Sequence, residues 1–71
     1  NAISVFPNPI VDFVNVKSKI GTISICDMNG KIVYSGIHNG KSEIDFRNIQ
    51  NGVYFLELIT EGGTVIEKII K

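Results

Sequence analysis

The amino-acid sequence predicts a small all-β domain, an antiparallel β-sandwich of about seven short strands. Turn-forming residues recur roughly every eight to twelve positions, a spacing typical of sandwiches and barrels. Apolar residues alternate with polar ones in most of the segments between the turns, and no segment keeps a helical period for long. Hydrophobic residues make up 44% of the chain, which is enough for a packed core. Two packed sheets are therefore the expected architecture.

The N-terminal part is expected to hold two strands separated by prolines. The first strand runs from Ile3 to Phe6 and stops at Pro7-Asn8-Pro9, because a proline has no amide hydrogen to donate to a ladder. The second runs from Asp12 to Lys17, and its two valines share one face. Phe13 interrupts this alternation, which indicates that part of the second face is covered as well.

A hairpin is expected in the middle of the chain. The segment from Thr22 to Asp27 alternates cleanly, with its two isoleucines facing the core. Asn29-Gly30 predicts a type I′ turn, in which both central residues take positive φ. The segment from Lys31 to Ser35 should return antiparallel, and Asn39-Gly40 marks another turn.

Three further strands are expected in the C-terminal half. A short strand covers Glu43 to Phe46, and in the following loop Ile49 is expected to plug the open end of the core. The strands Val53 to Thr60 and Thr64 to Ile70 form a last hairpin that is apolar on both faces, as expected inside a sheet or at a contact surface. The whole pattern predicts an immunoglobulin-like (Ig-like) sandwich.

Length and charge restrict the function. The chain has 71 residues, the size of one domain, and its seven basic and seven acidic residues cancel. This balance argues against binding of nucleic acid, and no basic amphipathic helix or apolar run of about 20 residues indicates membrane insertion. The single cysteine excludes an internal disulfide. The start lacks an initiator methionine and a signal-peptide pattern, so we expect residues 1–71 to be one domain cut from a longer protein.

No constellation of residues points to catalysis or to a cofactor. His38 is the only histidine and is expected in a turn, far in sequence from the strand cysteine Cys26, so no nucleophile–base pair is expected. Asp27-Met28-Asn29-Gly30 resembles the start of a calcium loop, but Gly36 stands where that loop needs its glutamate. A turn in which Asp27 binds local amides explains the same residues. We expect no enzyme, no cofactor and no metal.

Four sequence blocks resemble those of a known family. They are Val5-Phe6-Pro7-Asn8-Pro9 with Asp12 after it, Ile25 to Val33 around Asp27 and Gly30, Ile44-Asp45-Phe46 followed by Ile49 to Leu56, and the closing Lys68-Ile69-Ile70-Lys71. Across essentially its whole length the chain resembles the C-terminal sorting domain of the type IX (Por) secretion system of Bacteroidetes, of the T9SS type A family. Cys26 departs from the pattern, where the family commonly has an aromatic or aliphatic residue.

The resemblance implies an address label for an exported protein. Such a domain directs its N-terminal cargo from the periplasm through an outer-membrane translocon, after which a shuttle protein presents it to a cell-surface sortase. The sortase removes the domain, and the cargo stays at the cell surface or is released. The recognition residues that the resemblance implies are Pro7, Asn8, Pro9, Asp12, Asp27, Gly30, Gly52, Tyr54, Lys68, Ile69, Ile70 and Lys71.

The surface that is read is expected to be the last hairpin, Val53 to Lys71, because a sheet edge can bind a partner through main-chain hydrogen bonds. Deletion of residues 68–71 should then leave the cargo in the periplasm. If Gly52 holds a positive φ, Gly52→Val should disturb folding before recognition. The alternatives are a spacer or an accessory carbohydrate- or protein-binding module of a secreted hydrolase, although the chain has no tryptophan and only two tyrosines for a sugar site.

Overall fold

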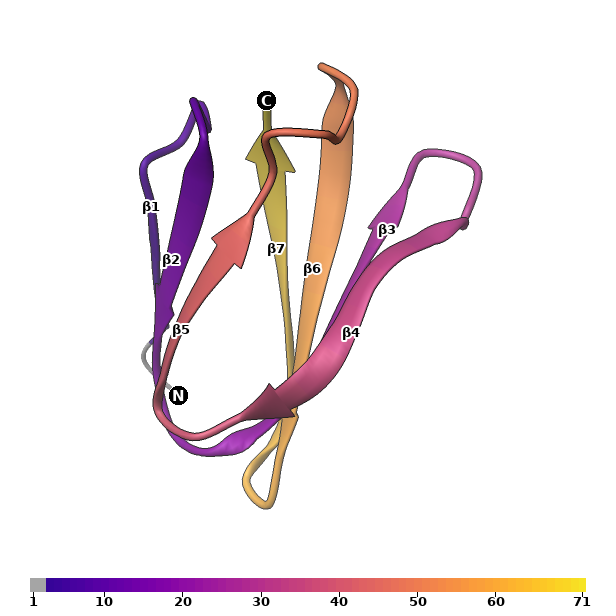
Figure 1. The fold of residues 1–71 in the computed structure, drawn as a ribbon. Helices are drawn as coiled ribbons and strands as arrows, with labels where there is room; N and C mark the ends of the chain where they lie inside the picture. Colours follow the sequence, from indigo (N-terminus) through magenta and orange to yellow (C-terminus); the bar gives the residue numbers. More distant parts are fainter. Residues whose placement is uncertain (1–2) are drawn as a thin grey trace.

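Seven strands form two antiparallel sheets in the computed structural model, which describes residues 3–71 (Figure 1). The sheets have the orders β1-β2-β5 and β4-β3-β6-β7. The predicted all-β sandwich of seven short strands is confirmed. The strands are β1 (Ser4–Phe6), β2 (Phe13–Lys17), β3 (Gly21–Asp27), β4 (Ile32–His38), β5 (Lys41–Asp45), β6 (Val53–Thr60) and β7 (Gly63–Ile70).

The core lies between the sheets and takes every second residue of the inner strands. Burial alternates along β6, where Tyr54, Leu56 and Leu58 face inward, as the alternation in the sequence predicts. Burial of a large apolar side chain contributes about 1.5–3 kcal/mol, so this cluster supplies most of the driving force for folding. Ile49 packs against it from the loop, as predicted. The buried apolar residues are Ile10, Val14, Val16, Ile23, Ile25, Ile44, Phe46, Tyr54, Leu56, Leu58 and Ile69.

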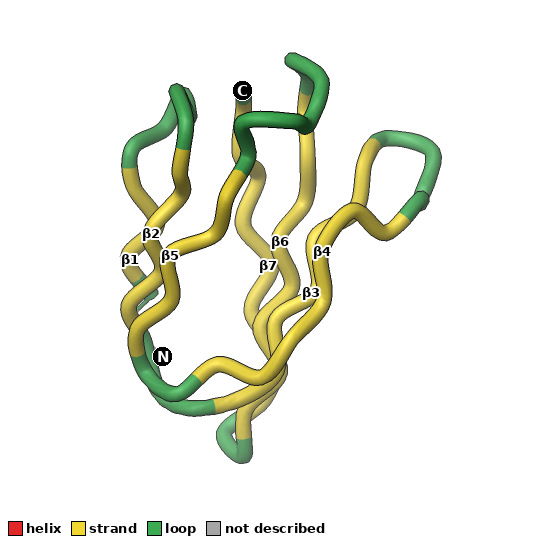
Figure 2. The backbone as a smooth tube through the Cα atoms, in the orientation of Figure 1, coloured by secondary structure: helices red, strands yellow, loops and turns green. Residues whose placement is uncertain are grey.

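Loops gather at the two ends of the sandwich (Figure 2). The loop between β1 and β2, the turn between β3 and β4 and the loop between β5 and β6 lie at the end where the C-terminus emerges. The start of β1 lies at the other end, since Ser4 pairs with Lys17 at the end of β2. The first strand therefore begins at the end of the sandwich opposite to the C-terminus.

The strand predicted at Lys31 to Ser35 is longer and starts later than expected. β4 begins at Ile32 and continues to His38, because its register with β3 pairs Gly36 with Ile23 and His38 with Gly21. Pairing with β3 continues through Gly36, although glycine is a weak strand former. β5 likewise begins at Lys41 rather than at Glu43.

The predicted type I′ turn between β3 and β4 is wrong. Gly30 has a positive φ of 84°, whereas Asn29 does not. The amide of Gly30 donates to the carbonyl of Asp27 at 3.1 Å, and the Asp27 carboxylate accepts the amides of Asn29 and Lys31, both at 2.9 Å. The aspartate therefore fixes a longer turn with a single glycine in the left-handed region. The predicted bonding of Asp27 to local amides is confirmed.

His38 lies buried at the end of β4, not in the exposed turn that the sequence suggested. Its Nε2 lies 3.0 Å from Ser18 Oγ and its Nδ1 lies 2.6 Å from Ser42 Oγ. A neutral imidazole has one donor and one acceptor nitrogen, and a hydroxyl can supply either partner. Ser18 precedes β3 and Ser42 belongs to β5, so the ring joins both sheets. Cys26 pairs with Ile32 near the other end of β3, away from His38.

We expect His38 to make the domain less stable in mild acid. Burial lowers the pKa of His38 in the folded chain, so the unfolded chain binds this proton more readily. The contribution of His38 to the free energy of unfolding is then fully present above a pH of about 6.5. Below this pH the free energy of unfolding decreases by at most about 1.4 kcal/mol per pH unit, until the ring is protonated in the folded chain too. Urea unfolding at a series of pH values measures this slope. His38→Gln should flatten it between about pH 7 and 5, and an unchanged slope in this variant would assign the effect to another group.

Candidate recognition site

Most of the motif residues meet at the end of the sandwich where β7 and the C-terminus lie (Figure 1). Three segments build this end: residues 7–10 after β1, residues 46–52 between β5 and β6, and residues 68–71. They are far apart in the sequence and are joined by hydrogen bonds rather than by a continuous sheet. Together we call these three segments the motif junction.

Asn8 fastens the N-terminal segment to the outer edge of β7. Its side-chain Nδ2 donates to the carbonyl of Lys68 at 3.3 Å, and its Oδ1 accepts the amide of Ile70 at 3.1 Å. The amide of Ile10 then donates to the carbonyl of Ile70 at 2.7 Å. The asparagine side chain thus occupies the place of a paired strand along this part of the edge.

The two prolines explain why a side chain has to make these bonds. Neither Pro7 nor Pro9 has an amide hydrogen, so the main chain cannot continue a ladder there, and the donors of an edge need other partners. Asn8, between the prolines, carries a donor and an acceptor on the same amide group. Ile10 follows immediately and is buried in the core, which holds the segment in place.

Lys71 closes the loop between β5 and β6. Its main chain exchanges two hydrogen bonds with Gly52, of 3.0 and 2.9 Å. Its ammonium group donates to the carbonyls of Phe46 and Ile49, both at 2.6 Å, and lies 3.5 Å from that of Arg47. An ammonium group has three N–H donors, so it can bind several carbonyls of one loop at the same time. The lysine is thus a cap on the loop and is only half exposed.

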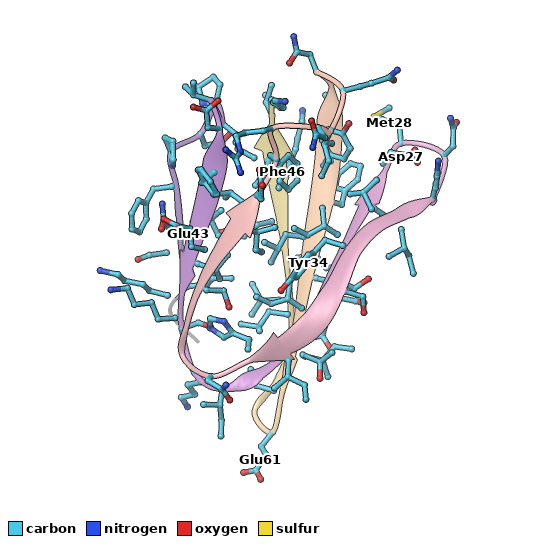
Figure 3. All side chains as sticks on the ribbon, viewed as in Figure 1. Asp27, Met28, Tyr34, Glu43, Phe46 and Glu61 are labelled. Carbon is cyan, nitrogen blue, oxygen red and sulfur yellow. The ribbon has the colours of Figure 1, made fainter. Side chains whose placement is uncertain are left out.

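Tyr54 supports the same loop from the side of the core. Its ring is buried and meets the ring of Phe46 edge to face, with centroids 5.5 Å apart (Phe46 is labelled in Figure 3). Its hydroxyl donates to the carbonyl of Gln50 at 2.5 Å. A buried tyrosine needs such a partner for its hydroxyl, so this residue combines core packing with anchoring of the loop.

Asp12 contributes through its main chain. Its carbonyl accepts the amide of Phe46 at 2.8 Å, while its side chain is exposed. The ion pair nearby joins Arg47 and Asp45 at 2.9 Å, and it lowers the pKa of Asp45 to about 2 through the hydrogen bonds from Arg47. The guanidinium of Arg47 also lies 4.9 Å from the ring centroid of Phe13. This stacking covers the outer side of Phe13, as its break in the alternation indicated.

Asp27 and Gly30 border the motif junction rather than belong to it. They form the turn between β3 and β4, near the labels of Asp27 and Met28 in Figure 3. Asp27 lines a small pocket together with Ile49 and Tyr54, so the turn reaches the loop after β5. Both residues shape this turn, and among residues 3–71 neither forms a hydrogen bond with the segments 7–10 or 68–71.

The condition of a positive φ at Gly52 is not met. Within residues 3–71 only Gly30, Gly40 and Gly63 have a φ in the left-handed region. A Cβ on Gly52 would lie 3.9 Å from the ring of Tyr54, which is an ordinary contact. Gly52 matters through its main chain, which pairs with Lys71, and this pairing is open to other residues.

The junction divides the motif residues into buried supports and exposed side chains. Ile69 is completely buried, and Tyr54 is 5% exposed, so neither can be read directly by a partner. Pro7, Pro9 and Lys68 are exposed, and Ile70 is 41% exposed. Sequence reasoning missed Ile10, whose only signal was an apolar residue directly after the proline segment.

The described residues contain no group of three or more His, Cys, Asp or Glu side chains placed to hold a metal ion. Among the same residues, no helix is long and apolar enough to cross a membrane.

A small sandwich whose motif residues tie its first and last segments into one exposed surface defines a module suited to recognition. The family model of the secretion system C-terminal sorting domain matches residues 4–71, and the chain belongs to this family. No curated protein matches the chain significantly. The domain is therefore a C-terminal sorting signal for type IX secretion, a non-catalytic tail whose cargo is exported across the outer membrane. The alternative of an accessory binding module is not supported.

Removal of the Asn8 amide should loosen the edge of β7. Asn8→Ala deletes both side-chain hydrogen bonds, and we expect a loss of about 1–2 kcal/mol, because the bonds are partly replaced by water. Urea unfolding measures it. Asn48→Ala changes an exposed loop asparagine at the same end and should cost less than about 0.5 kcal/mol. Equal effects of the two substitutions would remove Asn8 from this role.

Loss of the Lys71 cap should be more damaging than loss of the neighbouring exposed lysine. Lys71→Met keeps the length of the side chain but removes the ammonium from the carbonyl of Ile49 and leaves that of Phe46 with the amide of Ile49 alone, so we expect about 1–3 kcal/mol of destabilisation. Lys68→Met is the matched control and should change stability by about 0.5 kcal/mol or less. Thermal unfolding compares the two. Similar melting temperatures for both variants would contradict the cap.

Proposed function

We propose that this domain delivers a cargo joined to its N-terminal side, as one domain of a longer exported protein. On this route the cargo crosses the periplasm, and the outer-membrane translocon and a shuttle protein bind the folded domain. A cell-surface sortase then removes the domain, and the cargo ends at the surface or in the medium. Family membership over residues 4–71 is the observation that carries the proposal.

The surface that the machinery reads is proposed to be the exposed part of the last hairpin. On the outer face of β6 and β7, Phe55 pairs with Lys68 and Val53 with Ile70, which places apolar side chains beside one positive charge. Lys68 and Ile70 are exposed, and Val53 and Phe55 are partly exposed. The motif junction supports this proposal, because it fixes the main chain of both Lys68 and Ile70.

Deletion of residues 68–71 is a poor test of this surface. It would remove Ile69 from the core and Lys71 from the loop, so the domain would lose its fold together with any contact. Substitution of the exposed side chains separates the two effects, because their main-chain hydrogen bonds to the N-terminal segment remain.

The test is a reporter with a signal peptide, fused to residues 1–71 and expressed in a Bacteroidetes host. We expect export of the reporter, lost in a translocon mutant. The double variant Lys68→Glu, Ile70→Ser should fold, as thermal unfolding would show. It should reduce export about tenfold, which corresponds to a loss of about 1.4 kcal/mol of binding free energy. Lys41→Glu, on β5 of the other sheet, is the control and should be exported normally. Normal export of the double variant would refute the proposed surface.

A further inference from the structure

Three of the four sheet edges are protected against addition of another strand. β1 has three residues and ends at a proline. β5 carries exposed Lys41, Glu43 and Asp45 along its five residues. The edge of β7 is covered at its C-terminal end by Asn8 and the main chain of Ile10. Short strands, charges, prolines and covering segments are the usual means of protecting an edge.

The edge of β4 has none of these protections between Tyr34 and His38. Its seven residues, Ile32–His38, include no proline and no Asp, Glu, Lys or Arg, and among the described strands it pairs with β3 alone. A bulge at Val33 interrupts this pairing, which is regular from Tyr34 to His38. Ile32 and Ile37 are 60% and 79% exposed. A regular and uncharged edge of this kind is a template for pairing.

The main-chain groups of Ser35 and Ile37 point to the open side of β4. The amide of Asp27 donates to the carbonyl of Lys31, so that side of Asp27 faces β4. Because these directions alternate along a strand, Ile25 and Ile23 also face β4, where their partners are Tyr34 and Gly36. The residues between those partners therefore direct their amides and carbonyls away from β3.

The side chains beside this edge specify what an added strand should carry. On the outer face, Ile37 stands in one row with Thr22 and Ile59. A shallow groove of about 300 Å³ begins at this row and is lined by Ile20, Ile37 and Ile59, all exposed. Ser35 begins the next row, and the bulge at Val33 separates both residues from Ile32. An added strand would therefore place an apolar residue opposite Ile37 and a small polar residue opposite Ser35, two positions apart.

A second copy of this chain does not suit the edge. Five paired residues extend about 17 Å, and a strand is about 4.8 Å wide, so this pairing covers about 80 Å², far less than the about 800 Å² per partner of a stable dimer. An extended segment can bind through such an edge, because the main-chain bonds supply the affinity and the alternating side chains the specificity. β4 carries no Asp, Glu, Lys or Arg, so a charged segment would gain no ion pair with this strand and an uncharged one suits it better.

We propose that β4 accepts an extended, uncharged segment of a protein of the export machinery, which adds a fifth strand to the sheet β4-β3-β6-β7. The outward side chains of this segment are apolar opposite Ile37 and small and polar opposite Ser35. The assignment of the partner to the export machinery rests on the proposed function. The added strand would be continuous with the outer face of the last hairpin, so one partner can contact both.

The first test uses a synthetic five-residue peptide with isoleucine and serine at the second and fourth positions and threonine at the others. Titrated into the isotope-labelled chain, it should slow amide exchange at Ser35 and Ile37. Ser35→Pro removes an outward amide without breaking the ladder to β3, so binding should weaken at least about tenfold. Thr64→Pro makes the same change on the outer edge of β7 and should leave binding unchanged. If Ser35→Pro does not fold, Ser35→Lys replaces it, because a lysine also protects an edge.

Three results would overturn the proposal: unchanged peptide binding in folded Ser35→Pro or Ser35→Lys, protection that maps to β7, and a concentration-dependent dimer that Ser35→Pro abolishes. In the reporter assay, export should decrease about tenfold with Ser35→Pro and stay normal with Thr64→Pro. Normal export of folded Ser35→Pro would refute the machinery as the partner. Failure of the unmodified fusion to be exported would instead refute the proposed function and leave the peptide result intact.

Discussion

The attachment of residues 8–10 to the outer edge of β7 is the constraint on which the rest of the fold depends. It joins segments about 60 positions apart, and it does so across the two sheets, since residues 8–10 follow β1 and β7 belongs to the other sheet. The same contact covers part of an exposed edge and orders the main chain of Lys68 and Ile70. Once β7 is fixed there, the main chain of Lys71 meets Gly52 and its ammonium reaches the loop after β5.

Polar groups take the place of the disulfides that domains of this size often use. Asn8 joins the first segment to the last strand, Lys71 holds the loop after β5, and His38 joins the two sheets at the opposite end through Ser18 and Ser42. Each connects residues that the core alone would not order, and each satisfies groups that would otherwise be unpaired. The two ends of the sandwich are therefore fixed by different means: a charged cap and an edge contact at one, and a buried neutral ring at the other.

The sequence was sufficient for the number of strands and their inner faces, because apolar alternation repeats in nearly every segment, as Leu56 and Leu58 on β6 illustrate. It was insufficient where distant partners decide. His38 reads as a turn residue because Ser18 and Ser42 give no local signal of a buried site. Asn29-Gly30 favours one hairpin turn, but the carboxylate of Asp27 stabilises another. Gly52 resembles a glycine required for its φ, whereas its role is main-chain pairing with Lys71. Pairing order is likewise long-range, so Asn8 could be recognised as a motif residue but not as an edge cap.

A sorting signal has to be recognised without contacts from the cargo that it is attached to. The geometry provides for this, because the start of β1 lies at the end of the sandwich opposite the motif junction (Figure 1). A protein joined there is held away from Lys68, Ile70 and the loop after β5. Those groups are positioned by Asn8, Lys71 and the buried Ile69, all within the domain. This explains why the motif residues are spread over the whole chain. A surface that forms without contacts from the cargo needs both its exposed residues and the residues that position them within the same short sequence.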